Sequence, residues 1–163
     1  MSAENKLEIR RGTVEDSEII LEFIKKLAVY EKLSHMVDAT SDKIEESIFS
    51  PDSHVHTLLA FYDDQPVGFA LYFYNYSTFK ARKGLYLEDL YVDEEMRGRG
   101  FGKKLLAELA GIAKEENCGR FEWSVLDWNI PAIDFYKSIG AEAMDGWTVY
   151  RLEEDGIDNL ANT

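Results

Sequence analysis

A glycine-rich turn between a strand-like and a helical segment constrains this 163-residue chain most. Residues 87–92 read Leu-Glu-Asp-Leu-Tyr-Val, residues 97–103 read Arg-Gly-Arg-Gly-Phe-Gly-Lys, and helical spacing of apolar residues follows to about residue 117. Glycines let backbone N–H groups approach an anion closely, and a helix N-terminus adds partial positive charge behind them. The segment therefore predicts an anion-binding turn, preceded by the carboxylates of Glu88 and Asp89 on a strand.

Two common phosphate-binding motifs do not fit this turn. A P-loop has glycine at the first position of GxxxxGK[ST] and Ser or Thr at the last, where this chain has Arg97 and Lys104. The dinucleotide fingerprint GxGxxG needs its third glycine one residue after Gly102, and a second mononucleotide-binding half that this chain lacks. A tight turn that binds nothing would explain one glycine but not three. The turn therefore calls for a different anion-binding motif.

Hydrophobic periodicity predicts an α/β fold with a mixed sheet in a single domain, residues 1–163. We expect the strand–helix–strand unit of residues 86–126 to be a right-handed parallel crossover. The polar tail after Glu153 is expected to fray. Strands are predicted over 7–11, 55–62, 67–76, 83–92 and 120–126, helices over 13–32, 41–49, 101–117 and 131–140, and a final hairpin over 141–152.

Charge and composition exclude several classes of partner. There are 18 Lys and Arg against 31 Asp and Glu, a net charge of -13, which disfavours nucleic acid and anionic membranes. Cys118 is the single cysteine, so an intrachain disulfide is impossible. The three histidines show no metal-ligand spacing beyond His54-x-His56, which alternation on a strand explains equally well. The sequence shows neither a signal peptide nor a membrane-spanning run, so we expect a cytoplasmic protein without a metal.

The motif Arg97-x-x-Gly100-x-Gly102 resembles the Q/R-x-x-G-x-G/A signature of the GCN5-related N-acetyltransferase (GNAT) family. The resemblance covers nearly the whole chain and implies the GNAT fold, with six to seven strands flanked by about four helices. It is most similar to the diamine (spermidine/spermine) acetyltransferase branch, and within it to the thialysine Nε-acetyltransferase type. The stretches that carry this narrower resemblance are 76–80, 86–92, 125–129, 135–137, 140–141 and 146–147.

The resemblance also implies a site for acetyl-CoA as co-substrate. The family's backbone contacts to the pantetheine arm fall on Leu90, Tyr91 and Val92. The residues matching the pyrophosphate-binding turn are Arg97, Gly98, Arg99, Gly100, Phe101, Gly102 and Lys103. Those matching the segment near the reactive end of the cofactor are Asn129, Ile130, Pro131, Ala132 and Tyr136.

By the same resemblance, Tyr136 is the catalytic tyrosine that protonates the leaving thiolate, and Glu88 binds the amine and helps remove its proton. Tyr30, Glu31, Asp89 and Asp145 match further substrate-binding positions. Adjacent residues on a strand point to opposite faces, so Glu88 and Asp89 can share a cleft only if the strand bulges. Without a bulge, Glu88 is the better candidate for the amine.

We therefore expect transfer of acetyl to a primary amine of a small cationic substrate, by direct attack and in a homodimer. Ser77 and Phe79 stand where polyamine-selective members carry Asp and Trp, which favours thialysine, a lysine-like amino acid or a diamine. Acetylation of spermidine or spermine, a non-catalytic acyl-CoA-binding module and a protein N-acetyltransferase remain the alternatives.

Overall fold

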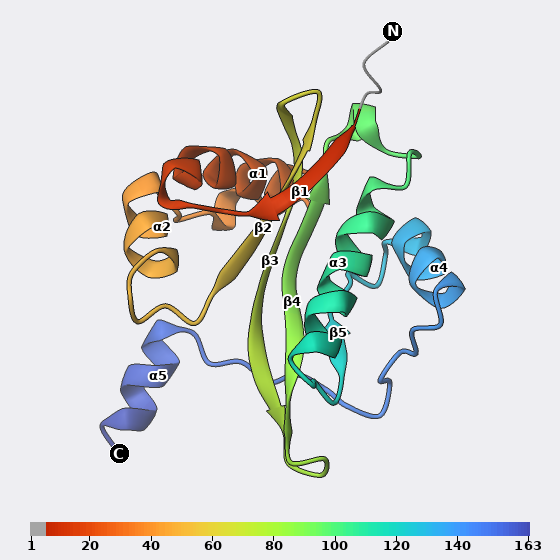
Figure 1. Ribbon diagram of the computed structural model, residues 1–163. Helices are drawn as coiled ribbons and strands as arrows, with labels where there is room; N and C mark the ends of the chain where they lie inside the picture. The colour runs from red at the N-terminus through yellow and green to blue at the C-terminus, as the bar shows by residue number, and fades with distance from the viewer. Residues whose placement is uncertain (1–5) are drawn as a thin grey trace, which may run out of the picture. The chain divides into compact units, whose positions relative to one another are not determined.

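A sheet with the strand order β1-β2-β3-β4-β5 organises the first part of the chain (Figure 1). The computed structural model describes residues 6–163, which divide into a unit ending at Ser124 and a second unit, Val125–Thr163. The strands of the first unit are β1 (Leu7–Arg11), β2 (His56–Tyr62), β3 (Gln65–Ser77), β4 (Arg82–Val92) and β5 (Phe121–Trp123). Its α-helices are α1 (Ser17–Tyr30), α2 (Ser41–Ile48) and α3 (Phe101–Glu115), with 3-10 turns at Val14–Asp16, Ser34–Met36 and Glu94–Met96.

The connections follow the predicted order. β2 and β3 form a hairpin whose two turn residues, Asp63 and Asp64, both have positive φ (51° and 62°), as a type I′ turn requires. β4, α3 and β5 form the predicted parallel crossover, since β4 and β5 pair in parallel. The α/β class with a mixed sheet is confirmed, and the described part of the chain forms five strands in place of the six to seven expected.

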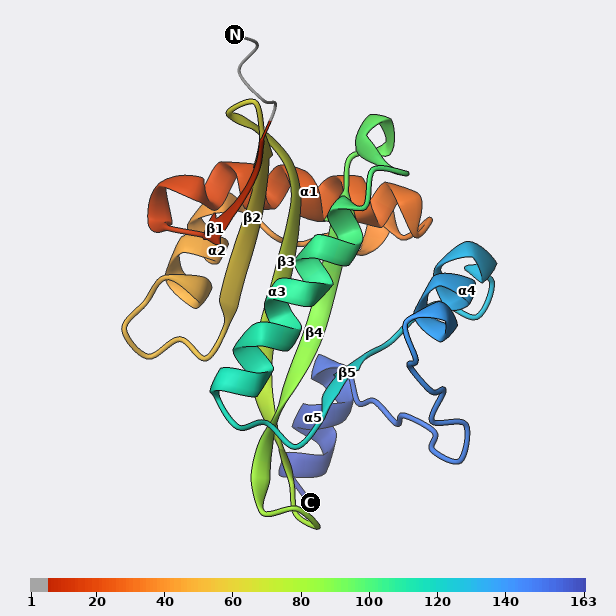
Figure 2. The ribbon, with the colours of Figure 1, turned by 45° about the vertical axis from the view of Figure 1, so that its right-hand side comes forward.

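The two faces of the sheet are covered by different helices (Figure 2). On one face, Phe23 of α1 stacks on Phe69 of β3 with ring centroids 5.5 Å apart, within a core that also includes Ile20, Ile44 and Leu59. On the other face, Phe101 at the start of α3 contacts the ring of Tyr62 at 5.3 Å. Side chains alternate along each strand, so each residue can be assigned to the α1 face or the α3 face.

A bulge interrupts this alternation in β4. Leu71 pairs with Asp89 but Tyr72 pairs with Leu87, so Glu88 is the extra residue. Leu71 packs against the core on the α1 face, which places Asp89 on that face; Leu87 lies beside Tyr72 on the α3 face. Glu88, next to Leu87, therefore also turns to the α1 face. The bulge brings both carboxylates to one side of the sheet.

The second unit differs from its prediction. α4 (Ile130–Ser138) is where the periodicity places a helix, but residues 141–152 form no strand, and the predicted hairpin is wrong. Only its turn is present, with Trp147 N–H donating to the Met144 carbonyl at 3.2 Å. A hairpin alone is marginal in water, and these residues pair with no strand among the described residues. The tail forms α5 (Glu154–Ala161) instead of fraying, with acidic residues in its first turn that complement the helix dipole.

Candidate active site

The glycine-rich turn has the backbone conformation that the motif predicts. Gly98 and Gly100 both have φ of 81°, and Gly100 is the left-handed N-cap of α3. A Cβ atom built on either glycine would meet nothing within 4 Å, so the space beside the turn is open. The first N–H groups of any α-helix lack an intrahelical acceptor, and α3 is 15 residues long. The turn is therefore suited to a phosphate group, with Arg97, Arg99 and Lys103 supplying positive charge.

The edge of β4 opens where the turn begins. β4 pairs with β5 only at Leu85, Tyr86 and Leu87, whereas its pairing with β3 continues to Val92. Beyond Leu87, no strand of residues 6–163 lies beside the edge of β4 that faced β5, and this stretch holds Leu90, Tyr91 and Val92. An extended ligand with amide groups can bind to such an edge as an added strand would. The geometry fits the predicted pantetheine contacts.

Three carboxylates gather where β4 bulges. Glu88 is exposed, Asp89 is half-buried, and Glu31 follows the last residue of α1. Burial, and then the negative charges of Glu88 and Glu31, raises the pKa of Asp89 to about 6. Burial also raises the pKa of Glu31. The three carboxylates therefore repel one another where burial limits their hydration. The positive charge of a bound ammonium group would offset this repulsion.

Asp89→Asn is expected to stabilise the protein at neutral pH. The ordinary pKa of this carboxyl is 3.8, so a value of about 6 means that its ionisation destabilises the fold. The corresponding free energy is about 3 kcal/mol at most, and partial exposure reduces it to about 1–3 kcal/mol. Because the pKa is raised, the protonated Asp89 does not destabilise the wild type below pH 4. The free energy of unfolding then falls as the pH rises through 6 and the carboxyl ionises.

Urea denaturation of wild type and Asp89→Asn at pH 4 and pH 8 measures this difference. The gain in free energy of unfolding should be present at pH 8 and absent at pH 4. Asp52→Asn, at an exposed carboxyl, is the matched control and should change neither value by more than about 0.5 kcal/mol. Equal effects of Asp89→Asn at both pH values would contradict the assignment.

Arg97 makes more contacts than its predicted role requires. Its guanidinium carbon lies 4.8 Å from the ring centroid of Tyr30 and 5.4 Å from that of Tyr91. Its Nε donates a hydrogen bond to the Val92 carbonyl at 3.0 Å. Arg99 lies 5.5 Å from the ring centroid of Tyr62, a contact that sequence reasoning missed. No local signal could reveal it, because the β2–β3 hairpin and the turn meet only in the folded chain.

The remaining predicted residues belong to the second unit. Asn129 is the N-cap of α4 and its Oδ1 accepts a hydrogen bond from Ala132 N–H at 3.4 Å. Ile130, Pro131 and Ala132 form the first turn of α4, and half-buried Tyr136 lies in its last part, 5.8 Å from the ring of Phe135. Asp145 precedes Gly146 in an exposed turn. Their roles stay predictions.

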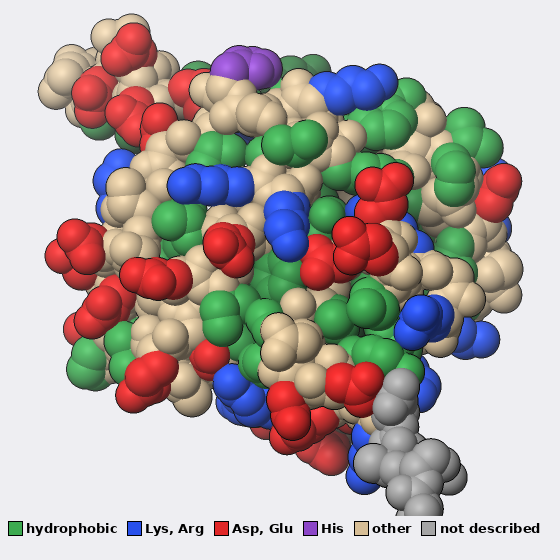
Figure 3. Space-filling view, turned by 90° about the horizontal axis from the view of Figure 1, so that it is seen from above, with side chains coloured by type: hydrophobic (Ala, Val, Ile, Leu, Met, Phe, Trp, Pro, Cys, Tyr) green, Lys and Arg blue, Asp and Glu red, His purple; other side chains and the backbone are tan. Residues whose placement is uncertain are grey.

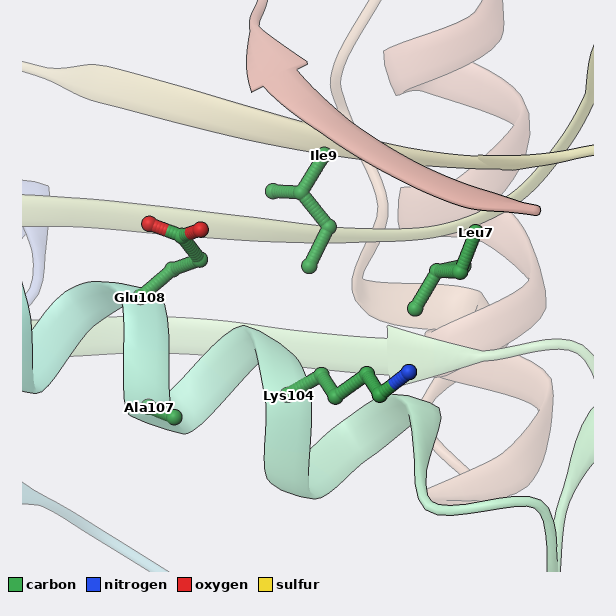
Figure 4. Close-up of a pocket in the computed structure, with 5 residues that line it drawn as sticks. All are labelled: Leu7, Ile9, Lys104, Ala107 and Glu108. Carbon is green, nitrogen blue, oxygen red and sulfur yellow. The ribbon is translucent and has the colours of Figure 1, made fainter.

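A hollow of about 360 Å³ lies elsewhere, between β1 and α3 (Figure 4). Its lining consists of Leu7, Ile9, Lys104, Ala107 and Glu108, none of which is a predicted site residue. Acidic and basic side chains are intermixed on the surface in Figure 3, which shows no patch of one sign alone. Within residues 6–163, neither a metal-binding group of His, Cys, Asp and Glu nor a helix able to span a membrane was found.

Known proteins similar to this chain support the fold and the interpretation of the glycine-rich turn. The sequence profile of the acetyltransferase (GNAT) family matches residues 20–141. A thialysine N-epsilon-acetyltransferase from Bos taurus is 37% identical over 94% of this chain and 96% of its own length. An L-ornithine N5-acetyltransferase from Arabidopsis thaliana is 37% identical over 78% of this chain and 53% of its own. A solved integron cassette protein from V. cholerae has a TM-score of 0.81 and 31% identity, over 96% of this chain and 98% of that one.

The chain belongs to the GNAT acetyltransferase family, which confirms the resemblance found in the sequence. Within that family it is an acetyl-CoA-dependent N-acetyltransferase that acts on an amine of a small cationic substrate.

Proposed function

We propose that the substrate is a thialysine- or lysine-like amino acid or a short diamine, and that the acetyl group passes to its amine by direct attack. The observation that carries this proposal is the bulge in β4, which turns Glu88 and Asp89 to one face beside Glu31. This acidic cluster lies on the strand that leads directly into the glycine-rich turn. A cationic amine and an anionic cofactor would therefore meet along one short segment.

The chemistry requires the ammonium nitrogen to lose two protons and the leaving thiolate to gain one. An alkylammonium group has a pKa near 10 and attacks only after losing a proton, which Glu88 accepts through water in this proposal. The amine nitrogen then bonds to the thioester carbonyl carbon, and the carbon–sulfur bond breaks. Tyr136 gives its phenolic proton to the departing thiolate and regains a proton from the acylated nitrogen through water, which leaves neutral coenzyme A, a neutral N-acetyl amine and a proton on Glu88 that passes to solvent. Neither an acyl-enzyme nor a metal is needed for these steps.

Ser77 and Phe79 lie too far from the acidic cluster to select between short amine substrates. Ser77 pairs with Arg82, six residues before the bulge, at the opposite end of β4. At about 3.3 Å per residue, the two places are about 20 Å apart along the strand. Substitutions at Ser77 and Phe79 can therefore select an amine bound at Glu88 of the same chain only through a long substrate. The preference for a short amine rests on the acidic cluster and on the thialysine and ornithine relatives.

Turnover of acetyl-CoA with a panel of amines tests this proposal. The panel comprises thialysine, lysine, ornithine, putrescine, spermidine, spermine and a lysine-containing peptide. We expect the highest kcat/KM for one of the first four. A clear preference for spermine or for the peptide would contradict it.

Glu88→Gln is expected to raise the amine KM about 10- to 100-fold, because a hydrogen bond to a charged group contributes about 1.5–3 kcal/mol. The KM for acetyl-CoA should change little. Steady-state kinetics with each substrate varied in turn separates the two. Glu46→Gln, at an exposed carboxyl of α2, is the control. An effect confined to acetyl-CoA would rule out the assigned role of Glu88.

We further propose that the protein is a cytoplasmic homodimer. Large apolar side chains of the second unit support the dimer, because Trp147, Val149 and Tyr150 are 78%, 84% and 93% exposed in the single chain. Light scattering should give twice the chain mass of 18.7 kDa, and a monomer mass at micromolar concentration would refute the dimer. Fractionation of cells tests the compartment.

A further inference from the structure

The guanidinium of Arg97 contacts two aromatic rings from different parts of the first unit. Tyr30 is the last residue of α1 and Tyr91 belongs to β4, and both ring centroids lie within 6 Å of the Arg97 guanidinium carbon. The Nε hydrogen bond to the Val92 carbonyl fixes the guanidinium further. Arg97 is followed directly by Gly98, the first glycine of the turn. Any contact that fixes Arg97 therefore fixes the start of the turn.

Three residues on one face of α1 contact the segment that runs from the end of β4 to Arg97. Phe23 contacts the ring of Tyr91 with centroids 6.0 Å apart, and Lys26 forms an ion pair with Asp93 at 2.9 Å. Tyr30, one helical turn further, contacts Arg97. The spacing of these residues places them on the same side of the helix. The contacts thus follow the chain from the end of β4 into the glycine-rich turn.

The C-terminal end of α1 also belongs to the acidic cluster. Glu31 follows Tyr30 directly, and its charge contributes to the electrostatics of Asp89. The end of α1 therefore acts on both parts of the site: Glu31 acts electrostatically on Asp89, and Tyr30 contacts Arg97 of the turn.

We propose that Arg97 is a positioning residue that ties the glycine-rich turn to Tyr30, so that Tyr30 strengthens acetyl-CoA binding without contacting acetyl-CoA. The inference rests on the proposed function, which places the amine beside Glu31 and the pyrophosphate at the turn. The cation–π contact orients the turn before the cofactor arrives, and pre-orientation reduces the cost of binding. Both rings lie within 6 Å of the Arg97 guanidinium carbon, so in this proposal Arg97 holds the turn in place as well as adding positive charge to it.

A double-mutant cycle on CoA binding tests the inference. Calorimetric titration with CoA, in the absence of amine, gives Kd for wild type, Tyr30→Leu, Arg97→Gln and the double variant. Gln is the other residue that the family signature allows at position 97, so the turn should still form. Tyr30→Leu is expected to raise Kd about three- to tenfold in the wild-type background and to have no effect in the Arg97→Gln background.

Two further variants separate positioning from a general loss of structure. Tyr30→Phe keeps the ring and should retain the wild-type Kd. Tyr62→Leu removes the ring beside Arg99 on the same turn, and its effect should add to that of Arg97→Gln. Thermal melting checks that each variant is folded.

The outcomes are distinct. An unchanged Kd in Tyr30→Leu, or an equal rise in both backgrounds, overturns the inference and leaves the proposed function standing. A rise in Tyr30→Phe equal to that in Tyr30→Leu also overturns it, because the hydroxyl and not the ring would then be responsible. Failure of the wild type to bind CoA overturns the inference together with the proposed cofactor site.

Discussion

Tyr136→Phe is expected to lower kcat about 10²- to 10³-fold with little change in the KM for acetyl-CoA. A positioned general acid contributes about 10²- to 10⁴-fold, because without it the thiolate must leave as an anion. Phe keeps the ring and its contact with Phe135, so α4 should be unaffected. Loss of an interaction made only in the transition state lowers kcat and leaves substrate binding intact.

Steady-state kinetics across pH 6–10 measures this effect. Tyr150→Phe removes a hydroxyl from a side chain that is 93% exposed and should leave kcat unchanged. A kcat for Tyr136→Phe within threefold of wild type would remove Tyr136 from the mechanism. A large rise in the KM for acetyl-CoA without a fall in kcat would make it a binding residue instead.

Gly100→Val is expected to raise the KM for acetyl-CoA about 10- to 100-fold. Gly100 has φ of 81° and ψ of 12°, a left-handed conformation that a β-branched residue avoids. Valine would either force the turn into another conformation or place its side chain in the open space beside the turn. If the turn binds the pyrophosphate as proposed, either change would remove hydrogen bonds from backbone N–H groups to phosphate, each contributing about 1.5–3 kcal/mol.

Gly111→Val is the matched control for this variant. Gly111 lies on the exposed side of α3, and a Cβ atom there also meets nothing within 4 Å, but its backbone is helical. Valine is the better helix former of the two, so the control should be at least as stable as wild type and keep its KM. If both variants bind acetyl-CoA normally, the turn is not the pyrophosphate site.

Much of the fold could be predicted because its signals are local. The alternation of apolar residues places β1, β2 and β3, and the helical stripe places α3, to within a few residues of their observed bounds. The polarity of the tail hides α5 in the sequence, although Ile157 and Leu160 have helical spacing. The hairpin over 141–152 was predicted from a real strand-like pattern. A strand, however, also needs a neighbouring strand to pair with, and the sequence of the segment alone does not show whether one is available.

In the candidate site, too, local features could be predicted from the sequence and tertiary contacts could not. The glycine-rich turn can be predicted because Gly98 and Gly100 meet its requirement for positive φ, which glycine adopts readily. The side to which Asp89 points does not, because it depends on the register between β3 and β4. The contact of Tyr30 with Arg97 joins residues far apart in the sequence, and neither one signals the other. Tertiary structure alone brings these groups together.

The bulge at Glu88 makes the length of β4 as important as its composition. Before the bulge, odd-numbered residues such as Leu85 and Leu87 lie on the α3 face; after it, even-numbered residues such as Leu90 and Val92 do. Deleting one residue between Leu87 and Leu90 would remove the bulge: Leu87 and Tyr91 would keep their faces, but only one carboxylate would remain on the α1 face beside Glu31. Relatives that share this chemistry should therefore tolerate many substitutions in this stretch but neither insertions nor deletions. An alignment gap there would mark a protein with a different site.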